Sequence, residues 1–337
     1  MKNKGFLSFL RGLGRAALCL IVGLALGALA LTAVAWLNHP EGEIVQAAET
    51  AWAEGLLSLL TGGWREGPIS LLGWATPDAL LALGVSLAWQ AGMLQLGGAG
   101  QYALGAAAAM LCASLLGLPW YACLAAAALA GALWGALPGI LKSKLRLREA
   151  LGTALTAWLA LYALQAFSPL LMWEQPQAPD LLLPALLITG TLAMLIWFGL
   201  KFTVPGLDIR LLGASEKTAR YAGADTGKTA FLVLCLSGLL GGAAGGMDCL
   251  LGSVKQLPDL SLALTGPGLH GLAAAALAGG HPLGAVCAAI VIKYLSLGTE
   301  TMNSALFSPE MGEGMLALTL YGSACFALGC GKGGRKA

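Results

Sequence analysis

Long apolar stretches without charged residues recur along the chain, and none of them alternates apolar with polar residues. The longest runs from 79 to 141, and others cover 16–37, 150–173, 181–200, 229–247, 260–292 and 314–331. About 20 apolar residues cross the hydrocarbon of a bilayer, so the longest stretch has room for three crossings. Only helices and closed barrels satisfy their backbone in lipid, and continuous apolar runs exclude the barrel. The pattern therefore predicts an all-α membrane protein.

The composition agrees with this prediction. Hydrophobic residues make up 58% of the 337 residues and charged residues only 11%, against about a quarter in a soluble domain. Such a chain cannot cover itself with polar surface. The first apolar run, 16–37, is too long for the core of a signal peptide and long enough for a full crossing, so we interpret it as a membrane helix.

The placement of charges predicts the topology. Loops rich in lysine and arginine stay in the cytoplasm, and such clusters lie before residue 16, at 142–148, at 201–228 and after 331. The loops between them are acidic or nearly neutral and are expected outside. Ten crossings satisfy every cluster, with both termini cytoplasmic. They are 16–37, three helices in 76–141 separated at 92–100 and 117–119, then 150–168, 184–200, 229–247, 264–278, 282–298 and 314–331.

The predicted helices form two groups of opposite orientation. Helices 2–5 start inward and helices 7–10 start outward, so we expect inverted repeats, a construction common in transporters, with the pathway near the repeat interface. Each group has a glycine-rich break, at 97–100 and at 266–268. We expect one transmembrane domain over 1–337, with an external segment at 38–72 and a cytoplasmic segment at 201–228.

The cytoplasmic segment contains a short helix with its own capping residues. Ser215 can cap the N-terminus, and Gly223 supplies a C-terminal stop. Glu216 suits the positive end of the helix dipole and lies four residues before Arg220, with which it can pair. From the residues alone, this is either a solvated connecting helix or a docking element that fits a groove of a partner.

The stretch 223–229, which reads GADTGKT, imitates a phosphate-binding loop. Such a loop has four residues between its first glycine and the Gly-Lys pair, and here there are three. The residues before it look helical rather than strand-like. We therefore expect no cofactor on this chain; if ATP drives the protein, ATP with Mg binds to a separate ATPase subunit. The sequence shows no catalytic set and no metal-ligand spacing, so we expect a transport subunit rather than an enzyme, and no nucleic-acid partner.

A few polar residues in or near apolar runs leave alternatives open. Lys293 can snorkel to the surface or face a polar pathway, and His270 can line the pathway or be a hydrogen-bonded packing histidine. Asp248 is expected in a solvated external hairpin after helix 7, and His281 in a turn. The scarcity of acidic residues within the apolar runs disfavours a proton- or sodium-coupled carrier.

Three blocks of the chain, 76–101, 206–223 and 270–284, carry a resemblance to a known family. They read TP…GMLQLGGAGQ, GLDIRLLGASEKTARYAG and HGLAAAALAGGHPLG. They are similar to TP…GLFNIGAEGQ, GFELRAVGxNPxAARYAG and FDGIAVALLGxxxPLG of the membrane permeases of ABC importers in the branched-chain amino acid and simple-sugar superfamily. The branch that they resemble most is that of nucleoside permeases working with basic-membrane-protein lipoproteins.

The resemblance implies a type II ABC importer fold in the bacterial cytoplasmic (inner) membrane. It also implies a cytosolic ATPase docked on 207–223, a second permease subunit, often a sister chain, and an external substrate-binding lipoprotein. The residues expected at the ATPase contact are Arg210, Gly213, Ser215, Glu216, Ala219, Arg220, Ala222 and Gly223. Those expected along the translocation pathway are Gln95, Gly97, Gly100, Gln101, Gly268, His270 and Lys293.

Departures from the family pattern bear on the cargo. The family's Asn and Glu in the first block are Gln95 and Ala99 here, and an Asn usual in helix 5 falls at Ala157. Lys293 stands where a small residue is usual. The resemblance implies nucleosides or a related small molecule, while riboflavin and a ribose-type sugar stay open. An ATP-independent secondary carrier or channel is the alternative class.

Overall fold

The computed structural model describes residues 57–65, 67–145, 148–167, 181–252 and 266–301, with single positions near 25–33, at 55 and near 314–318. The described elements are helices, which confirms the expected all-α class. They fall into two compact units, Pro68–Val291, and Met1–Gly67 with Ile292–Ala337. The expected helix 10, nearly all of helix 1 and the loop 168–180 lie outside the described residues.

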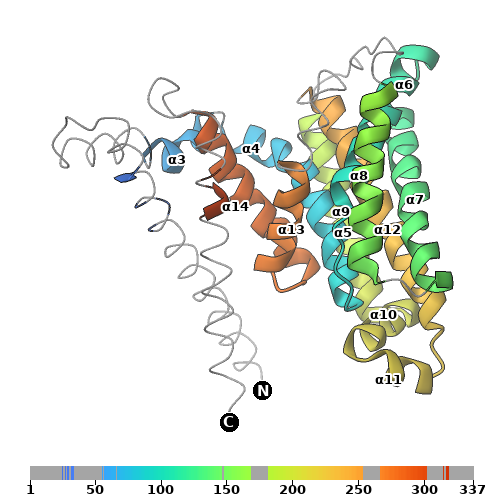
Figure 1. Cartoon of the computed structure of the whole chain (residues 1–337). Helices are drawn as coiled ribbons and strands as arrows, with labels where there is room; N and C mark the ends of the chain where they lie inside the picture. Colours follow the sequence, from blue (N-terminus) through green and yellow to red (C-terminus); the bar gives the residue numbers. More distant parts are fainter. Residues whose placement is uncertain are drawn as a thin grey trace. The chain divides into compact units, whose positions relative to one another are not determined.

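The larger unit, Pro68–Val291, is a bundle of helices (Figure 1). Its elements are α4 (Pro68–Trp74), α5 (Thr76–Gln90), α6 (Gly98–Leu116), α7 (Trp120–Leu145), α8 (Glu149–Phe167), α9 (Leu182–Phe202), α10 (Val204–Ala214), α11 (Glu216–Tyr221), α12 (Thr226–Leu251), α13 (Pro267–Leu277) and the first half of α14 (Pro282–Glu300).

Within the described residues, six helices are long and apolar enough to cross a membrane, namely α6, α7, α8, α9, α12 and α14. A seventh crossing results if α4 and α5, which bend by 45° at their junction, form one span. α13 has 11 residues, about 16 Å, and is shorter than the crossing expected over 264–278. Gly279 and Gly280 follow it with positive φ and stop the helix. Ten crossings and inverted repeats stay predictions.

α12 is the central helix of the larger unit and packs against α5, α6 and α7. Glycines permit this close approach. A Cβ added to Gly242 would come closer than 3.0 Å to the carbonyl oxygen of Ala127 on α7. A Cβ added to Gly245 would also come closer than 3.0 Å to the carbonyl oxygen of Tyr102 on α6. Small residues replace bulky ones where helices in a membrane touch backbone to backbone. The glycine-rich sequence of α12 therefore has a packing function.

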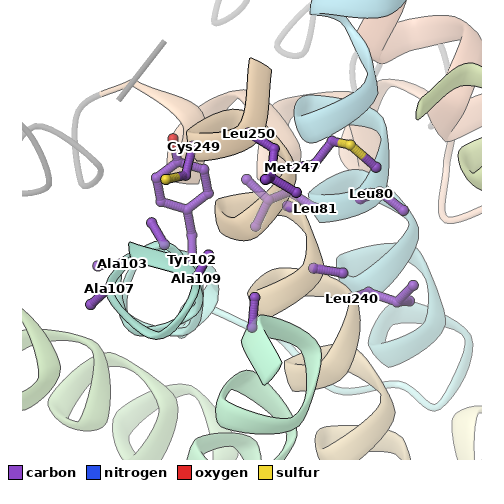
Figure 2. Packing of buried hydrophobic residues seen from close by; sticks show 14 of the residues in the cluster. Leu80, Leu81, Tyr102, Ala103, Ala107, Ala109, Leu240, Met247, Cys249 and Leu250 are labelled. Atoms are coloured by element: carbon purple, nitrogen blue, oxygen red, sulfur yellow. The ribbon is translucent and has the colours of Figure 1, made fainter. Parts of the chain in front are cut away.

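The apolar core of the larger unit lies where α5, α6 and α12 meet. Leu80, Tyr102 and Met247 are among its fully buried side chains. Figure 2 shows the ring of Tyr102 pointing from α6 toward Cys249 on α12. Alanine and glycine fill most of the other buried positions on α6, which lets the neighbouring helices approach closely.

Two helices are longer than the charge-free runs predicted. α7 continues to Leu145, so Lys142 and Lys144 lie in its last turn rather than in a loop, and Lys142 pairs with Glu149 at 3.0 Å. α12 extends three residues before and four residues after the expected 229–247. Asp248 is consequently only 8% exposed, inside the bundle, and the expected solvated hairpin position is wrong. Charge-free runs mark the apolar centre of a helix, whose ends continue beyond it.

The smaller unit contains α3 (Leu57–Thr61), the 3₁₀ helix η2 (Gly62–Trp64) and the part of α14 from Ile292. The hydroxyl of Tyr294 on α14 donates to the carbonyl of Leu60. A Cβ on Gly298 would collide with the backbone of Leu59, so the two segments touch directly. The described part of the expected external segment 38–72 is thus largely helical.

Candidate functional site

The segment formed by α10 and α11, 204–221, lies at one end of the bundle (Figure 1). Its capping matches the sequence prediction. The hydroxyl of Ser215 accepts the N–H of Thr218 at 3.4 Å and caps α11, and the guanidinium of Arg220 donates to the carboxylate of Glu216 at 2.6 Å. We call 204–223 the coupling segment.

The C-terminus of α11 closes with a Schellman motif. Gly223, with φ of 86°, donates its N–H to the carbonyl of Arg220, and Ala224 donates to that of Ala219, each at 3.0 Å. The stretch that imitates a phosphate-binding loop is therefore the junction between α11 and α12, preceded by a helix. Asp225 caps α12 by accepting the N–H of Lys228 at 3.1 Å, and this hydrogen bond lowers the pKa of its carboxyl.

Ser215→Ala is expected to loosen α11 without unfolding the bundle. The change removes the side-chain acceptor of one orphan N–H and costs about 1 kcal/mol of local helix stability. Faster hydrogen exchange at the amides of 217–221, with unchanged exchange in α12, would be the expected result. Ser215→Asp restores an acceptor and is the matched control. Equal protection of α11 in both variants would contradict the capping role.

The end of α10 lies directly against the end of α5. A Cβ on Gly213 would come closer than 3.0 Å to the carbonyl oxygen of Gln90 and would lie 3.2 Å from the amide nitrogen of Gly92. Gly92 has φ of 70°, a conformation that suits glycine, and its own Cβ would lie 3.1 Å from the Cα of Gly213. No side chain separates the two backbones, so the end of α10 and this turn touch directly.

The turn at Gly92 begins a non-helical segment, 91–97, which we call the α5–α6 break. Gln95 in this break donates from Nε2 to Oε1 of Gln101 on α6 at 3.0 Å, and both side chains are at most 2% exposed. The Oε1 atom of Gln95 has no hydrogen-bond partner among the described residues. The N–H of Leu96 donates to the hydroxyl of Thr153 on α8 at 3.2 Å, which anchors the break.

α5 and α13 run parallel and touch along their length. A Cβ on Gly271 would come closer than 3.0 Å to Leu81, and the side-chain amide of Gln90 donates to the carbonyl of Gly280 at 2.8 Å. The predicted topology has both helices running inward, which agrees with this direction. His281 lies in the turn, as expected, and its Nδ1 accepts the N–H of Gly284 at 3.4 Å.

Buried polar side chains also gather at the other end of α5, away from the coupling segment. Nδ1 of His270 on α13 lies 3.6 Å from Oδ2 of Asp78, whose side chain is 5% exposed. The hydroxyl of Tyr102 on α6 donates to Oδ2 of Asp248 on α12. We call these four residues the α5 polar cluster. Asp78 escaped the sequence prediction, although a carboxylate at the start of a 63-residue charge-free run was a usable signal.

The remaining pathway candidates separate into groups. Gly97 is the last residue of the α5–α6 break, and Gly100 lies just after it in α6, where an added Cβ would lie 2.6 Å from the Cα of Ala157 on α8. Gly268 lies in the first turn of α13, near His270 in the chain. Lys293 is half-buried in the part of α14 that belongs to the smaller unit. The structure brings together Gln95, Gln101, Gly97 and Gly100, and places His270 at the opposite end of α5.

Apolar helices of membrane-crossing length with polar side chains enclosed between them are the features of a multi-pass membrane protein. The chain belongs to the family described as branched-chain amino acid transport system / permease component, whose model matches residues 67–324. The family resemblance drawn from the three sequence blocks is thereby confirmed. Permeases of this class reside in the inner membrane and work in general with an ATPase and a substrate-binding protein.

Two named relatives are similar to parts of the chain. The guanosine ABC transporter permease protein NupP of Bacillus subtilis (strain 168) is 27% identical over 253 residues, which cover 67% of this chain and 72% of that protein. The nucleoside ABC transporter permease protein NupB of Lactococcus lactis subsp. cremoris (strain MG1363) is 27% identical over 122 residues, which cover 35% of this chain and 32% of that protein. The names of both relatives describe ABC permeases for nucleosides, the cargo class of the branch that the sequence blocks resemble.

Proposed function

We propose that this chain is the membrane-spanning permease subunit of an ATP-driven importer of nucleosides. Its expected partners are a cytosolic ATPase, a second permease subunit and an external substrate-binding lipoprotein. The family match supports the importer, and the two relatives whose names specify guanosine and nucleosides support the cargo. This subunit performs no covalent chemistry, and ATP hydrolysis belongs to the ATPase.

The observation that carries the mechanism is the contact of Gly213 with Gln90 and Gly92. When the ATPase moves the coupling segment, this backbone contact moves the α5–α6 break. The break holds Gln95, whose buried amide pairs with Gln101, so the movement acts on polar groups inside the bundle. In this mechanism ATP hydrolysis moves the coupling segment, and the resulting movement of the α5–α6 break opens or closes the translocation pathway.

The coupling segment has a surface suited to docking in a groove. Tyr221 is 93% exposed, and the side chains of Glu216 and Arg220 are about three-fifths exposed, while Ala219 is fully buried against the bundle. An exposed aromatic side chain beside a charged pair is typical of residues that dominate an interface. Arg210, Ala222 and Gly223 are also exposed, as a docking role requires.

Changing this surface is expected to detach the ATPase. Tyr221→Ala and the double change Glu216→Ala with Arg220→Ala should each weaken ATPase binding to the detergent-solubilised permease by about tenfold or more, because anchor residues contribute about 2 kcal/mol each. Lys144→Ala, an exposed cation at the end of α7, is the control and should bind normally.

The binding constant is measured by biolayer interferometry, with nucleoside uptake in proteoliposomes as a second readout. Uptake that persists without any ATPase, or variants that bind and transport like the wild type, would contradict the importer. The compound retained by the purified lipoprotein tests the cargo. A purine nucleoside is expected, and a bound isoalloxazine would replace nucleosides with riboflavin.

A further inference from the structure

The α5 polar cluster is not used by the coupling mechanism, although it contains titratable groups enclosed in a membrane protein. Asp78, Tyr102, Asp248 and His270 come from four different helices, α5, α6, α12 and α13. Asp78 and Asp248 both lie close enough to Tyr102 to act on it electrostatically. Ionisable side chains in a membrane interior are costly and are usually retained because they act in transport.

The two carboxylates of the cluster differ in their hydrogen bonding. Asp248 accepts the hydroxyl of Tyr102 and is thereby tied to α6. Asp78 is 3% exposed, and its Oδ2 atom has no hydrogen-bond partner among the described residues. Nδ1 of His270 is 3.6 Å away from this oxygen, which is too long for a hydrogen bond. A buried carboxylate oxygen without a partner costs free energy that a bound donor would recover.

The local backbone favours a carboxylate at this place and disfavours a cation. Asp78 lies in the first turn of α5, and His270 in the first turn of α13, where the helix dipoles are positive at their N-terminal ends. These dipoles favour negative charge or a hydrogen-bond acceptor beside the two helix ends. The two positive helix ends would repel a metal ion or an organic cation. They would not repel a neutral ligand with hydroxyl donors.

Ribose presents the hydroxyl groups that such a site can bind. A carboxylate that accepts ribose hydroxyls is a recurrent mode of nucleotide recognition, and an imidazole can hydrogen-bond a neighbouring hydroxyl. We propose that Asp78, assisted by His270, recognises the ribose hydroxyls of the nucleoside during its passage through the permease. This inference rests on the proposed nucleoside cargo and assigns the contact that distinguishes a riboside from its deoxy analogues.

The test compares uptake of guanosine with uptake of 2′-deoxyguanosine and 3′-deoxyguanosine in proteoliposomes that contain the complete transporter. The binding protein is saturated with each compound, so the maximal rates report on the permease and not on capture. The wild type should transport guanosine about tenfold faster than at least one deoxy analogue. Asp78→Asn should reduce this ratio to near one by slowing guanosine alone, and His270→Gln should reduce it partially.

Thr189→Val is the matched control, because Thr189 on α9 also carries a buried oxygen without a hydrogen-bond partner among the described residues. It should keep the ratio of the wild type. If Asp78→Asn slows all three compounds equally and lowers the melting temperature, the pair is structural and the ribose contact is wrong. If the wild type transports guanosine but does not prefer it to either deoxy analogue, the inference is also wrong. A wild type that transports no nucleoside overturns the proposed function instead.

Discussion

Gly213→Ala is expected to abolish uptake while the ATPase stays bound. The added Cβ would overlap the carbonyl oxygen of Gln90 and press on the amide of Gly92, and both are backbone atoms that cannot rotate away. The end of α10 must therefore separate from the α5–α6 break. Without this contact, movement of the coupling segment no longer reaches Gln95. Uptake should fall at least tenfold, while ATP hydrolysis continues uncoupled from transport.

The measurement combines uptake and ATPase activity in the same proteoliposomes. Gly199→Ala is the control, because a Cβ at this position on α9 meets nothing within 4 Å. It should leave both activities near those of the wild type. Gel filtration confirms that each variant is folded. If Gly213→Ala transports normally, the contact does not transmit the work of the ATPase, and another part of the coupling segment must do so.

The second large effect concerns folding. Gly242→Ala places a Cβ closer than 3.0 Å to the carbonyl oxygen of Ala127 and 2.8 Å from the Cα of Gly131. α7 and α12 must then move apart along their contact. Overpacking of this kind typically costs 1–3 kcal/mol, and collision with backbone belongs at the upper end, about 3 kcal/mol. The melting temperature of the purified permease should fall clearly.

Gly152→Ala on α8 is the matched control, because its Cβ would only touch the side chain of Pro138 at 3.9 Å. The melting temperature of this variant should equal that of the wild type or be slightly higher, since alanine favours the helix more than glycine does. Thermal unfolding followed by thiol labelling of Cys249, which is buried in α12, gives the comparison. Equal melting of the two variants would show that α7 and α12 adjust without cost.

The sequence predicts the helices and the caps well because both depend on local chemistry. The hydroxyl of Ser215 is attached to the helix that it caps, and Glu216 and Arg220 are neighbours on one turn, so their contacts follow from spacing alone. The apolar runs likewise locate most crossings, since crossing lipid requires a certain length of apolar chain. The coupling segment could therefore be described before its position in the fold was known.

Contacts between distant parts of the chain could not be predicted in this way. Asp248 lies just past a charge-free run, and only the position of Tyr102 on another helix shows that it is enclosed. The pairing of Asp78 with His270 depends on α13 running beside α5, which no local pattern specifies. α13 begins only at Pro267, after Gly266, although the apolar run that predicted it starts earlier. The turn at its other end, at Gly279 and Gly280, follows the sequence prediction.

The central place of α12 has a consequence for how the protein is made. α5, α6 and α7 all pack on α12 but are synthesised well before it. Until translation passes residue 251, these helices reside in the membrane without the surface that their glycines fit. During that interval the nascent chain depends on the insertion machinery or on lipid to cover Gly105 and Gly131. Biogenesis should therefore be most vulnerable between the insertion of α7 and that of α12, a window in which quality-control proteases would act.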